Sequence, residues 1–408
     1  MIQLEEIVRR YGDRPLFLGD ENRTSYTEYA SMVATAEVGE EDLLTLCLDW
    51  TADSFSRLLA AFNAGKCVFP GNEWPGGRLE PFRKHRPLLI LKTGGTTGRP
   101  KHAVHSVRTL IQTYQVEERP ESRLLVLYAP GHIAGLDAFL QALHRGGTLV
   151  LPSGRDPELV ARAIERHRVQ ILPATPTYLN FMALSGALEG RDLSSVEIIP
   201  HGAEPMPDSV RQRLQRTFPK ARLVQRFGMT ELGALPVRPD PDDPAALFLN
   251  AAGYGWRVEE GELQILSPSR MLGTLEEGPL RDAEAWHGTG DLAELTPRGS
   301  IRILGRREGL INVGGEKILP ETVEALLMEL PMVLEAAVEG IANPLTGQAV
   351  AARIVFKGQP DAMQLLRSMR QLTSSRGLSL AYVPTRVEAV ETIPETGVGK
   401  KSRRLGKS

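Results

Sequence analysis

The chain has 408 residues, of which 42% are hydrophobic and 24% are charged. This composition is typical of a folded globular protein and excludes a disordered or fibrous chain. The 48 Lys and Arg residues are balanced by 50 Asp and Glu residues, so the formal net charge is −2. Because no overall positive field would draw such a protein to nucleic acid or to an anionic membrane, the sequence predicts neither as a partner.

Cysteine usage and the distribution of apolar residues predict a soluble cytoplasmic protein. Cys47 and Cys67 are too few for a disulfide framework, and no Cys/His cluster has zinc-ligand spacing. Residues 1–10 lack the charged-then-apolar order of a signal peptide, and no segment approaches the ~20 apolar residues that span a bilayer. At ~100–200 residues per domain, we expect two or three domains.

Short apolar runs alternate with amphipathic segments between residues 88 and 235. The apolar runs predict buried strands at 88–92, 124–128, 148–151, 169–172, 196–199 and 222–227. The amphipathic segments predict helices at 103–118, 136–145, 157–168, 176–185 and 207–217. Alternating strands and helices are joined by parallel crossovers, so we expect a doubly wound α/β unit over 88–235.

The pattern changes after residue 235. A loop rich in Pro and Asp is followed by short strand candidates at 254–258, 261–266, 291–295 and 300–304, which predict a β-rich subdomain over 236–304. The segment 309–408 predicts a small α+β domain with the order strand, helix, strand, strand, helix, strand, and with helices near 320–329 and 361–375. Between the two, residues 305–309 read as a hinge because Gly305 and Gly309 bracket polar residues; an ordinary polar turn is the alternative.

The strongest local motif is TGGTTGRPK at 93–101, directly after a predicted strand. Its glycines allow backbone N–H groups to approach an anion, its threonines add hydroxyl donors, and Lys101 adds charge. We therefore expect an oligophosphate ligand, and a flexible surface turn is the alternative. The lysine lacks the Gly and Ser/Thr neighbours of a Walker A loop, and no G-x-G-x-x-G follows a strand, so neither a P-loop NTPase nor a nicotinamide enzyme is supported.

Three further segments carry polar groups that suit a nucleotide. FGMTE (227–231) follows a predicted strand, where open α/β sheets place ligands, and a helix cap is its alternative explanation. Asp291 follows a glycine, and a short acid there accepts both hydroxyls of a ribose; alone, the pair would indicate a turn. Lys400 follows a glycine-rich stretch near the end of the chain, where a solvated basic tail is the alternative.

Taken together and in this order, the motifs resemble those of the adenylate-forming superfamily, which includes acyl- and aryl-CoA ligases, peptide-synthetase adenylation domains and luciferases. TGGTTGRPK is similar to the phosphate loop T-S-G-T-T-G-x-P-K of that family, and FGMTE is similar to Y-G-x-T-E. The remaining resemblances are APGHIAGL (129–136), HGAEPMP (201–207, the adenine loop), WHGTGDL (286–292, the ribose motif), GRREGLINVGGEKILPETVE (305–324, the hinge and thioesterification segment) and PETGVGKKSR (394–403, the lysine motif).

The resemblance implies an α/β fold in which a large N-terminal domain has distorted, doubly wound, mostly parallel sheets plus a β-rich subdomain. A small, mobile α+β C-terminal domain would carry the lysine. Expressed as domains, residues 1–304 form the adenylation core, 305–309 the hinge and 310–408 the C-terminal domain.

The resemblance also implies a binding site for ATP and Mg²⁺. Thr230 would contact the α-phosphate, Glu231 would hold the metal, and Asp291 would bind the ribose hydroxyls with Arg306 nearby. The β- and γ-phosphates would be held by Thr93, Gly94, Gly95, Thr96, Thr97, Gly98 and Lys101. Gly202, Ala203 and Glu204 would line the adenine, Phe227 would stack on it, and Gly228 and Met229 would adjoin it.

A carboxylic acid is the substrate that the resemblance implies. Attack of a carboxylate on ATP brings two anions together, and a positioned ammonium offsets their repulsion, which is the role implied for Lys400. His132 would lie at the carboxylate end of the acyl pocket, although a histidine in such a loop also makes ordinary polar contacts. Tyr178, His201, Gly228 and Met229 are further pocket candidates. Glu308 would occupy the hinge, and Gly314, Gly315 and Lys317 would lie along a tunnel for the thiol of coenzyme A.

The sequence departs from the family pattern in several places. Gly94 replaces a serine, Gly131 stands where a bulky residue precedes the histidine, and Glu308 replaces an Asp or Lys. Only 92 residues precede Thr93, which is short for the family, as is the stretch between Glu231 and Asp291. We expect the wall around a long acyl chain to be reduced, so a small aromatic or short acyl acid fits better than a fatty acid.

The sequence therefore predicts an AMP-forming carboxylic acid ligase that transfers its acyl group to coenzyme A. One alternative is a stand-alone adenylation enzyme of secondary metabolism that passes the adenylate to an acyl carrier protein or an amine. Another is a non-catalytic nucleotide-binding homologue, which the retention of Glu231, Asp291 and Lys400 disfavours. A homodimer is one candidate assembly, which the sequence does not decide.

Overall fold

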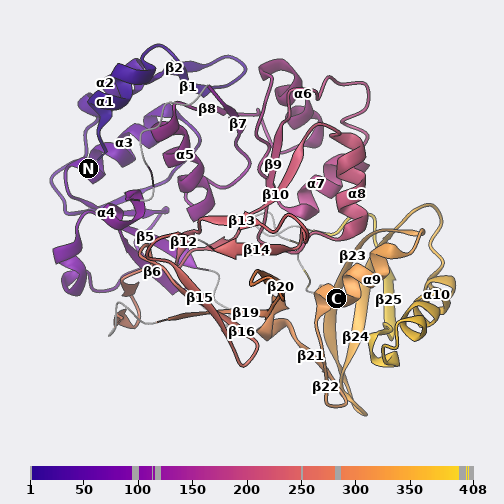
Figure 1. Cartoon of the computed structure of the whole chain (residues 1–408). Helices are drawn as coiled ribbons and strands as arrows, with labels where there is room; N and C mark the ends of the chain where they lie inside the picture. The colour runs from indigo at the N-terminus through magenta and orange to yellow at the C-terminus, as the bar shows by residue number, and fades with distance from the viewer. Residues whose placement is uncertain are drawn as a thin grey trace.

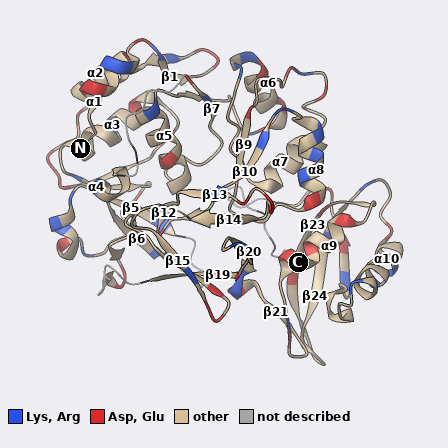
Figure 2. Ribbon diagram, in the orientation of Figure 1, with Lys and Arg blue, Asp and Glu red and all other residues tan. Residues whose placement is uncertain are grey.

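The computed structural model describes residues 2–93, 101–112, 114, 121–249, 251–280, 286–394, 401 and 403. Figure 1 shows the N-terminus and the C-terminal segment at opposite sides of the molecule, with strands of the β-rich segment at the lower centre. In the view of Figure 2, acidic and basic residues alternate along the described ribbon, in line with the net charge of −2. None of the helices in the described ranges has the length and apolar character that a bilayer crossing requires.

The first sheet has the strand order β2-β1-β8-β7. Its strands are β1 (Pro15–Leu18), β2 (Arg23–Ser25), β7 (Arg123–Leu125) and β8 (Thr148–Val150). Single parallel bridges at Ile171 connect β7 to the pair β9 (Ile198–His201) and β10 (Arg222–Gln225). Except for the β1–β2 hairpin, these pairings are parallel, which is the geometry expected of crossover connections.

The second sheet has the strand order β18-β17-β6-β5-β4-β3. It consists of β3 (Leu43–Leu46), β4 (Cys67–Pro70), β5 (Leu88–Thr93), β6 (Lys101–Ser106), β17 (Gly273–Thr274) and β18 (Gly278–Pro279). The strands β3, β4 and β5 are parallel, whereas β6 returns antiparallel to β5, and Thr93 pairs with Lys101. Both ends of the predicted phosphate loop are therefore held at adjacent strand ends.

Helices cover both sheets. They are α1 (Leu4–Tyr11), α2 (Tyr26–Thr35), α3 (Ala52–Asn63), α4 (Val107–Ile111), α5 (Ile133–Arg145), α6 (Pro157–His167), α7 (Pro176–Leu184) and α8 (Asp208–Thr217). Side chains cap several of them: Ser25 and Glu28 form a capping box at α2, and Asp156 caps α6 ahead of Pro157. Phe17, Tyr29, Phe55 and Phe139 form an aromatic core beneath α2, α3 and α5.

The β-rich segment forms a six-stranded sheet with the order β13-β14-β20-β19-β16-β15, in which all pairings are antiparallel. Its strands are β13 (Val237–Pro239), β14 (Ala246–Leu249), β15 (Gly255–Glu259), β16 (Glu262–Leu266), β19 (His287–Leu295) and β20 (Ile301–Arg306). A separate hairpin, β11 (Gly228–Met229) with β12 (Gly233–Ala234), precedes the sheet. Phe227 and Met229 pack against the apolar face of this segment.

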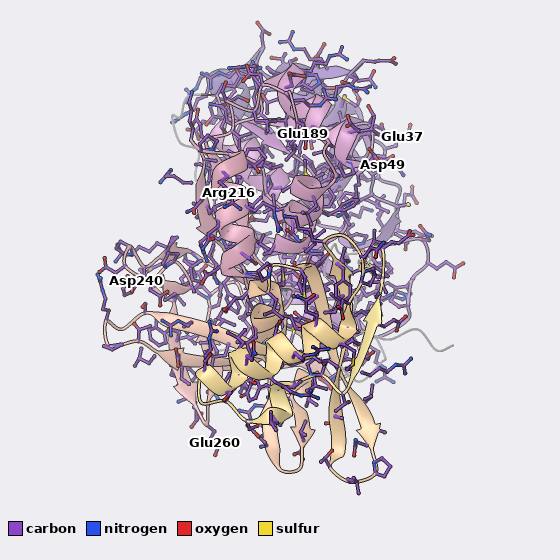
Figure 3. All side chains as sticks on the ribbon, turned by 90° about the vertical axis from the view of Figure 1, so that its right-hand side faces the viewer. Glu37, Asp49, Glu189, Arg216, Asp240 and Glu260 are labelled. Carbon is purple, nitrogen blue, oxygen red and sulfur yellow. The ribbon has the colours of Figure 1, made fainter. Side chains whose placement is uncertain are left out.

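The C-terminal segment forms a five-stranded sheet with the order β22-β21-β24-β23, and β25 is added to β24. Its elements are β21 (Ile311–Val313), β22 (Glu316–Ile318), α9 (Pro320–Glu329), β23 (Val333–Asn343), β24 (Gly347–Phe356), α10 (Ala362–Ser375) and β25 (Arg386–Ala389). Figure 3 shows α10 lying across this sheet. Apolar residues of α9 and β23 share one buried core with α6, α7 and α8, so the C-terminal segment is docked on the helices of the first part.

The fold class predicted from the sequence is confirmed, with three local corrections. The helix predicted at 103–118 is wrong over its first residues, because residues 101–106 form β6. Pairing with β5 buries Ala103 and Val104, and this tertiary contact overrides helix propensity. The strand predicted at 169–172 is reduced to bridges at Ile171, and the C-terminal segment has one more strand, β22, before its first helix than predicted.

Candidate active site

The predicted nucleotide segments lie where strands end. In the first sheet, His201 pairs with Gln225 and bridges to Ala174, so the residues that follow β9 and β10 emerge at one edge. Ligands of open α/β sheets bind beyond such an edge. The calls at Gly94, Gly95, Thr96, Thr97 and Gly98, and at Lys400, lie outside the described residues.

The loop after β9 is tightly constrained. A Cβ atom at Gly202 would lie 2.5 Å from the carbonyl oxygen of Arg226, so only glycine fits, and Ala203 has a positive φ of 71°. The Glu204 carboxylate accepts a hydrogen bond from the Thr177 N–H at 2.7 Å, at the start of α7. Glu204 therefore orients the predicted adenine loop by capping α7. The backbone of this loop stays the predicted contact for the adenine base.

His201 is enclosed without a hydrogen-bond partner. Its side chain is 1% exposed, and neither ring nitrogen has a partner in the described structure. Burial, with a smaller contribution from the nearby Arg211 charge, lowers the pKa of His201 to about 4. A neutral imidazole at the end of β9 can donate or accept one hydrogen bond, which makes it a credible contact for a polar group of a bound acid.

The hairpin β11–β12 shapes the next segment. A Cβ atom at Gly228 would lie 2.8 Å from the carbonyl oxygen of Gly233, so glycine is required for the close pairing. The carbonyl of Thr230 accepts a hydrogen bond from Nε2 of His105, at 2.7 Å. His105 lies on β6, and burial lowers its pKa to about 4, which keeps the imidazole neutral. This contact ties the Thr230–Glu231 turn to the strand that carries Lys101.

The side chain of Asp291, on β19, is fixed in its orientation by neighbouring residues. Its side chain is 7% exposed, and Nε of Arg306 lies 2.8 Å from its Oδ1 atom. The same guanidinium donates to the carbonyl of Thr289 at 2.8 Å, which fixes its orientation. Gly290 adopts a positive φ of 72°, and its N–H donates to Glu262. The carboxylate predicted to bind ribose is thus buried, paired and oriented, with the arginine that the sequence placed nearby.

Lys101 is bound to an acidic turn. Its amine lies 2.6 Å from the carboxylate of Glu277, which raises the pKa of Lys101, and both side chains are exposed. Beside it, Glu276 accepts hydrogen bonds from the backbone N–H of His102 and pairs with Nδ1 of its ring at 2.7 Å. Burial opposes ionisation of Glu276, but these bonds outweigh it and lower the pKa of Glu276. The sequence analysis missed both acids, which lie about 175 positions away from their partners.

The predicted acyl-pocket residues have structural contacts of their own. His132 caps α5, because its Nδ1 accepts a hydrogen bond from the Ala134 N–H at 3.3 Å. The helix α5 packs against β12, which brings it next to Gly228 and Met229. Tyr178 is buried in the core of the helical layer, and its hydroxyl donates to the Arg155 carbonyl at 2.7 Å. Tyr178 is therefore the pocket candidate with the clearest packing role.

A polar group that the sequence analysis did not single out lies on α5. Asp137 accepts hydrogen bonds from the hydroxyl of Tyr114 and from Gln141, the latter at 2.7 Å. Burial raises the pKa of Asp137, although these bonds and the charge of Arg226 oppose the effect. The spacing i, i+4 between Asp137 and Gln141 was the available signal, but it indicates a helix contact rather than a site.

The predicted hinge lies between the β-rich sheet and the C-terminal sheet, and the predicted thiol segment lies in the first hairpin of the C-terminal sheet. Glu308 is exposed in the short turn between β20 and β21. Gly314 and Gly315 form the turn of the β21–β22 hairpin with φ values of 60° and 96°, and Lys317 is exposed on β22. Space is open around a Cβ atom built at Gly315. The roles of these residues as a joint and as a thiol passage stay predictions.

A surface cavity of about 490 Å³ contains none of these residues, because it lies near the carboxyl ends of α7 and α8. Within the described ranges, no three His, Cys, Asp or Glu side chains gather as a metal site. Glu231 is half-buried. A single carboxylate fits Mg²⁺ when substrate phosphates complete the coordination, so Glu231 remains a candidate ligand.

Comparison with known proteins identifies the class. The AMP-binding enzyme model matches residues 4–280, and the AMP-binding enzyme C-terminal domain model matches residues 322–400. The chain therefore belongs to the AMP-binding enzyme family. It is 30% identical to feruloyl-CoA synthase of Amycolatopsis sp over 398 residues, covering 85% of this chain and 75% of that protein. It is 27% identical to enterobactin synthase component E of Escherichia coli, covering 76% of this chain and 62% of that protein.

Solved structures confirm the fold. The anthranilate CoA ligase AuaEII in complex with anthranoyl-AMP has a TM-score of 0.81 at 18% identity, covering 98% of this chain and 94% of that chain. The amide bond synthetase McbA from Marinactinospora thermotolerans has a TM-score of 0.75 at 21% identity, covering 98% and 97%. Some curated relatives are longer: the chain spans 62–64% of the length of two of them.

Proposed function

We propose that the protein is an AMP-forming acid:thiol ligase. The observation that carries the proposal is the buried Asp291 carboxylate, oriented by Arg306, in a chain that belongs to the AMP-binding enzyme family. An ionised acid held in this way accepts hydrogen bonds from both hydroxyls of a ribose. The constrained loop at Gly202 and the Thr230 turn supply the adenine and α-phosphate contacts.

In the first half-reaction, a carboxylate oxygen attacks the α-phosphorus of ATP. The new C–O–P linkage forms as the bond to the β-phosphate breaks, which releases pyrophosphate. Lys101 binds the leaving phosphates after it exchanges Glu277 for them, and Lys400 offsets the repulsion between the two reacting anions. Glu231 would hold Mg²⁺, which when bound would neutralise charge on the phosphates.

In the second half-reaction, a thiol attacks the acyl carbonyl and AMP departs. Coenzyme A is the acceptor that we propose, with the thiol entering past Gly314 and Gly315. Residues 305–309 are proposed as the joint about which the segment 310–408 turns between the two steps. An acyl carrier protein or an amine is the alternative acceptor.

The substrate that we propose is a small carboxylic acid, in preference an aromatic one. A relative that is 30% identical over 85% of this chain is named feruloyl-CoA synthase, and feruloyl is an aromatic acyl group. The neutral, unpartnered His201 adds a polar contact for a ring substituent.

The test is carboxylate-dependent exchange between ATP and labelled pyrophosphate across aromatic, hydroxy-aromatic and aliphatic acids, followed by mass spectrometry for the thioester in the presence of coenzyme A. We expect exchange with at least one small aromatic acid and a coenzyme A thioester of the same acid. Exchange without a thioester would assign a carrier protein or an amine as the acceptor. ATP binding without exchange for any acid would overturn the proposed ligase activity.

A further inference from the structure

The described tail residues Lys401 and Arg403 are anchored in the C-terminal domain. Nε and Nη2 of Arg403 donate to the two carboxylate oxygens of Glu324 at 2.8 and 3.0 Å, which is a bidentate pair. Nη1 of the same guanidinium lies 2.9 Å from Glu321. Both acids lie on α9, one turn apart, so they face the tail together.

Lys401 also contacts Glu324. Its side chain is only 8% exposed, its amine donates to the Ala336 carbonyl on β23 at 2.6 Å, and it lies 3.6 Å from Glu324. Glu324 is 6% exposed and also accepts the Val338 N–H at 2.9 Å. Two acidic and two basic side chains therefore meet in one cluster, which we call the tail clamp: Glu321, Glu324, Lys401 and Arg403.

We expect the tail clamp to lower the free energy of unfolding relative to an apolar cluster, so packing alone does not explain it. Removing four charged groups from water carries a desolvation penalty that mutual attraction offsets only in good geometry, and apolar side chains of similar size would pack at lower cost. Burial opposes the charge on Glu324, yet Lys401 and Arg403 outweigh it and hold the pKa of Glu324 below its ordinary value. A charge-paired, bidentate arrangement gives orientation that apolar contacts do not.

The tail clamp also borders the predicted hinge. A Cβ atom at Gly305 would lie 2.6 Å from Oε2 of Glu321, so this carboxylate packs directly on the backbone at the end of β20. The charge of Glu204, in the predicted adenine loop, contributes to raising the pKa of Arg403. The cluster thus connects the described tail residues, α9 and the predicted hinge.

We propose that the tail clamp positions Lys400 for adenylation by fixing the residues that flank it in the chain. Lys401 is the peptide neighbour of Lys400, so its buried amine and the paired Arg403 hold the chain in place next to that lysine. Glu321, Glu324, Lys401 and Arg403 are positioning residues, because they act through Lys400. The inference rests on the proposed function, in which Lys400 stabilises the reacting anions.

The experiment compares Lys401→Met with Arg376→Met. Arg376 is a matched control, because it pairs with Glu329 on the same domain but is exposed. We expect Lys401→Met to lower the rate of acid-dependent ATP–pyrophosphate exchange by about 10²-fold, the effect of misplacing a catalytic group by about 1 Å. The KM for ATP and the transfer of a supplied acyl-adenylate to the thiol should stay within about twofold, because neither needs a positioned Lys400. The control variant should leave all three unchanged.

A second variant guards against misfolding. Arg403→Lys keeps the charge but loses the bidentate geometry, and we expect an intermediate loss in the exchange rate. Hydrogen–deuterium exchange should show faster exchange in the peptide 386–408 of Lys401→Met, with unchanged peptides over α1 to α8.

Equal loss of both half-reactions, or an unaltered exchange rate in Lys401→Met, would overturn the positioning role. Failure of the wild-type protein to exchange with any acid would instead reject the proposed function. The two failures are therefore distinguishable.

Discussion

The two ends of the proposed nucleotide site differ in how far they are organised before ligand arrives. At the ribose end, Asp291 is 7% exposed and paired with Arg306, whose guanidinium is itself held by a backbone carbonyl. At the phosphate end, Lys101 and Glu277 are 42% and 64% exposed and form an ordinary surface ion pair. The ribose end is preorganised. At the phosphate end, by contrast, Lys101 has to release the Glu277 carboxylate before it can bind a phosphate.

The phosphate end nevertheless contains one rigidly held residue. Four residues along β6 from Lys101, His105 is fully enclosed and bonds the Thr230 carbonyl. The strand therefore has a rigid end at His105 and an adaptable end at Lys101. This contrast predicts that substitutions at the enclosed positions cost most and that the exposed pair responds weakly and in proportion to salt.

Acid should lower the free energy of unfolding through His105. The pKa of His105 is about 4, below the ordinary value near 6.5, so the unfolded chain binds a proton before the folded one does. Stability from this group is complete above about pH 6.5 and is lost between pH 6.5 and 4, by up to about 3 kcal/mol. Urea unfolding of wild type and His105→Gln across this range checks the prediction. We expect the free energy of unfolding to depend less steeply on pH in the variant than in the wild type. Equal slopes for the two proteins would contradict the prediction.

The ribose end should show the largest effect on binding. Asp291→Ala removes two charge-assisted hydrogen bonds to the ribose, so we expect the KM for ATP in the exchange assay to rise by about 10²-fold. The effect should shrink with 2′-deoxy-ATP, because one of the two hydroxyls is then absent.

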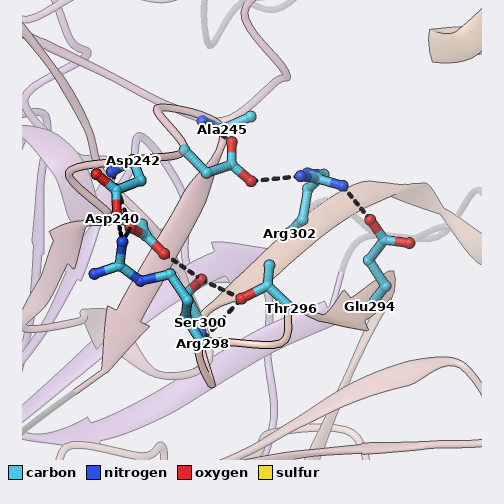
Figure 4. Close-up of polar contacts among 9 residues, drawn as sticks. Asp240, Asp242, Ala245, Glu294, Thr296, Arg298, Ser300 and Arg302 are labelled. Atoms are coloured by element: carbon cyan, nitrogen blue, oxygen red, sulfur yellow. Dashed lines mark hydrogen bonds and ion pairs between the residues drawn. The ribbon is translucent and has the colours of Figure 1, made fainter.

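A matched control for this prediction lies in the same sheet. Asp240 is also buried, and it pairs with Ser300 and Arg298 in the cluster of Figure 4. Asp240→Asn should lower the melting temperature but leave the KM for ATP unchanged. A similar rise in KM for both variants would show that Asp291 acts through stability rather than through the ribose.

The sequence predicted the frame of the site better than its contacts. Alternating apolar runs predicted the crossovers, whereas the glycine before Asp291, which alone would indicate a turn, lies inside β19 with a positive φ. The strand β6 was mistaken for a helix, because its burial comes from pairing with β5 and not from its own periodicity. Local pattern carries no information about such a partner.

Long-range electrostatic partners were beyond prediction for the same reason. Glu276 and Glu277 were not considered in the sequence analysis, and only folding brings them to His102 and Lys101. Likewise, the sequence assigned the basic residues at the end of the chain to the lysine motif, with a solvated tail as the alternative, but it gave no sign that Arg403 binds Glu324. Charges that pair across more than 75 positions have no sequence spacing by which to recognise them.

Lys101 should contribute less to ATP binding than Asp291 does. Lys101→Met removes a partly solvated charge from the β- and γ-phosphates, and we expect about a tenfold rise in the KM for ATP. AMP lacks these phosphates, so its dissociation constant, measured by calorimetry, should stay within about twofold. A matching loss of AMP affinity would show that the lysine supports the fold of the site instead.

Glu277→Gln should act in the opposite direction and is the smallest effect of the series. Neutralising Glu277 frees Lys101 for phosphate, so we expect the KM for ATP to fall by about two- to fivefold, the range of an exposed ion pair. The gain should fade at high salt, which already screens the pair, and it should vanish in the Lys101→Met background, because the two residues act on one contact. Glu294, which pairs with Arg302 in Figure 4, supplies the control, and Glu294→Gln should leave the KM unchanged. A gain that persists in Lys101→Met would mean that Glu277 repels ATP directly, and the exchange of anions at Lys101 would then not describe this end of the site.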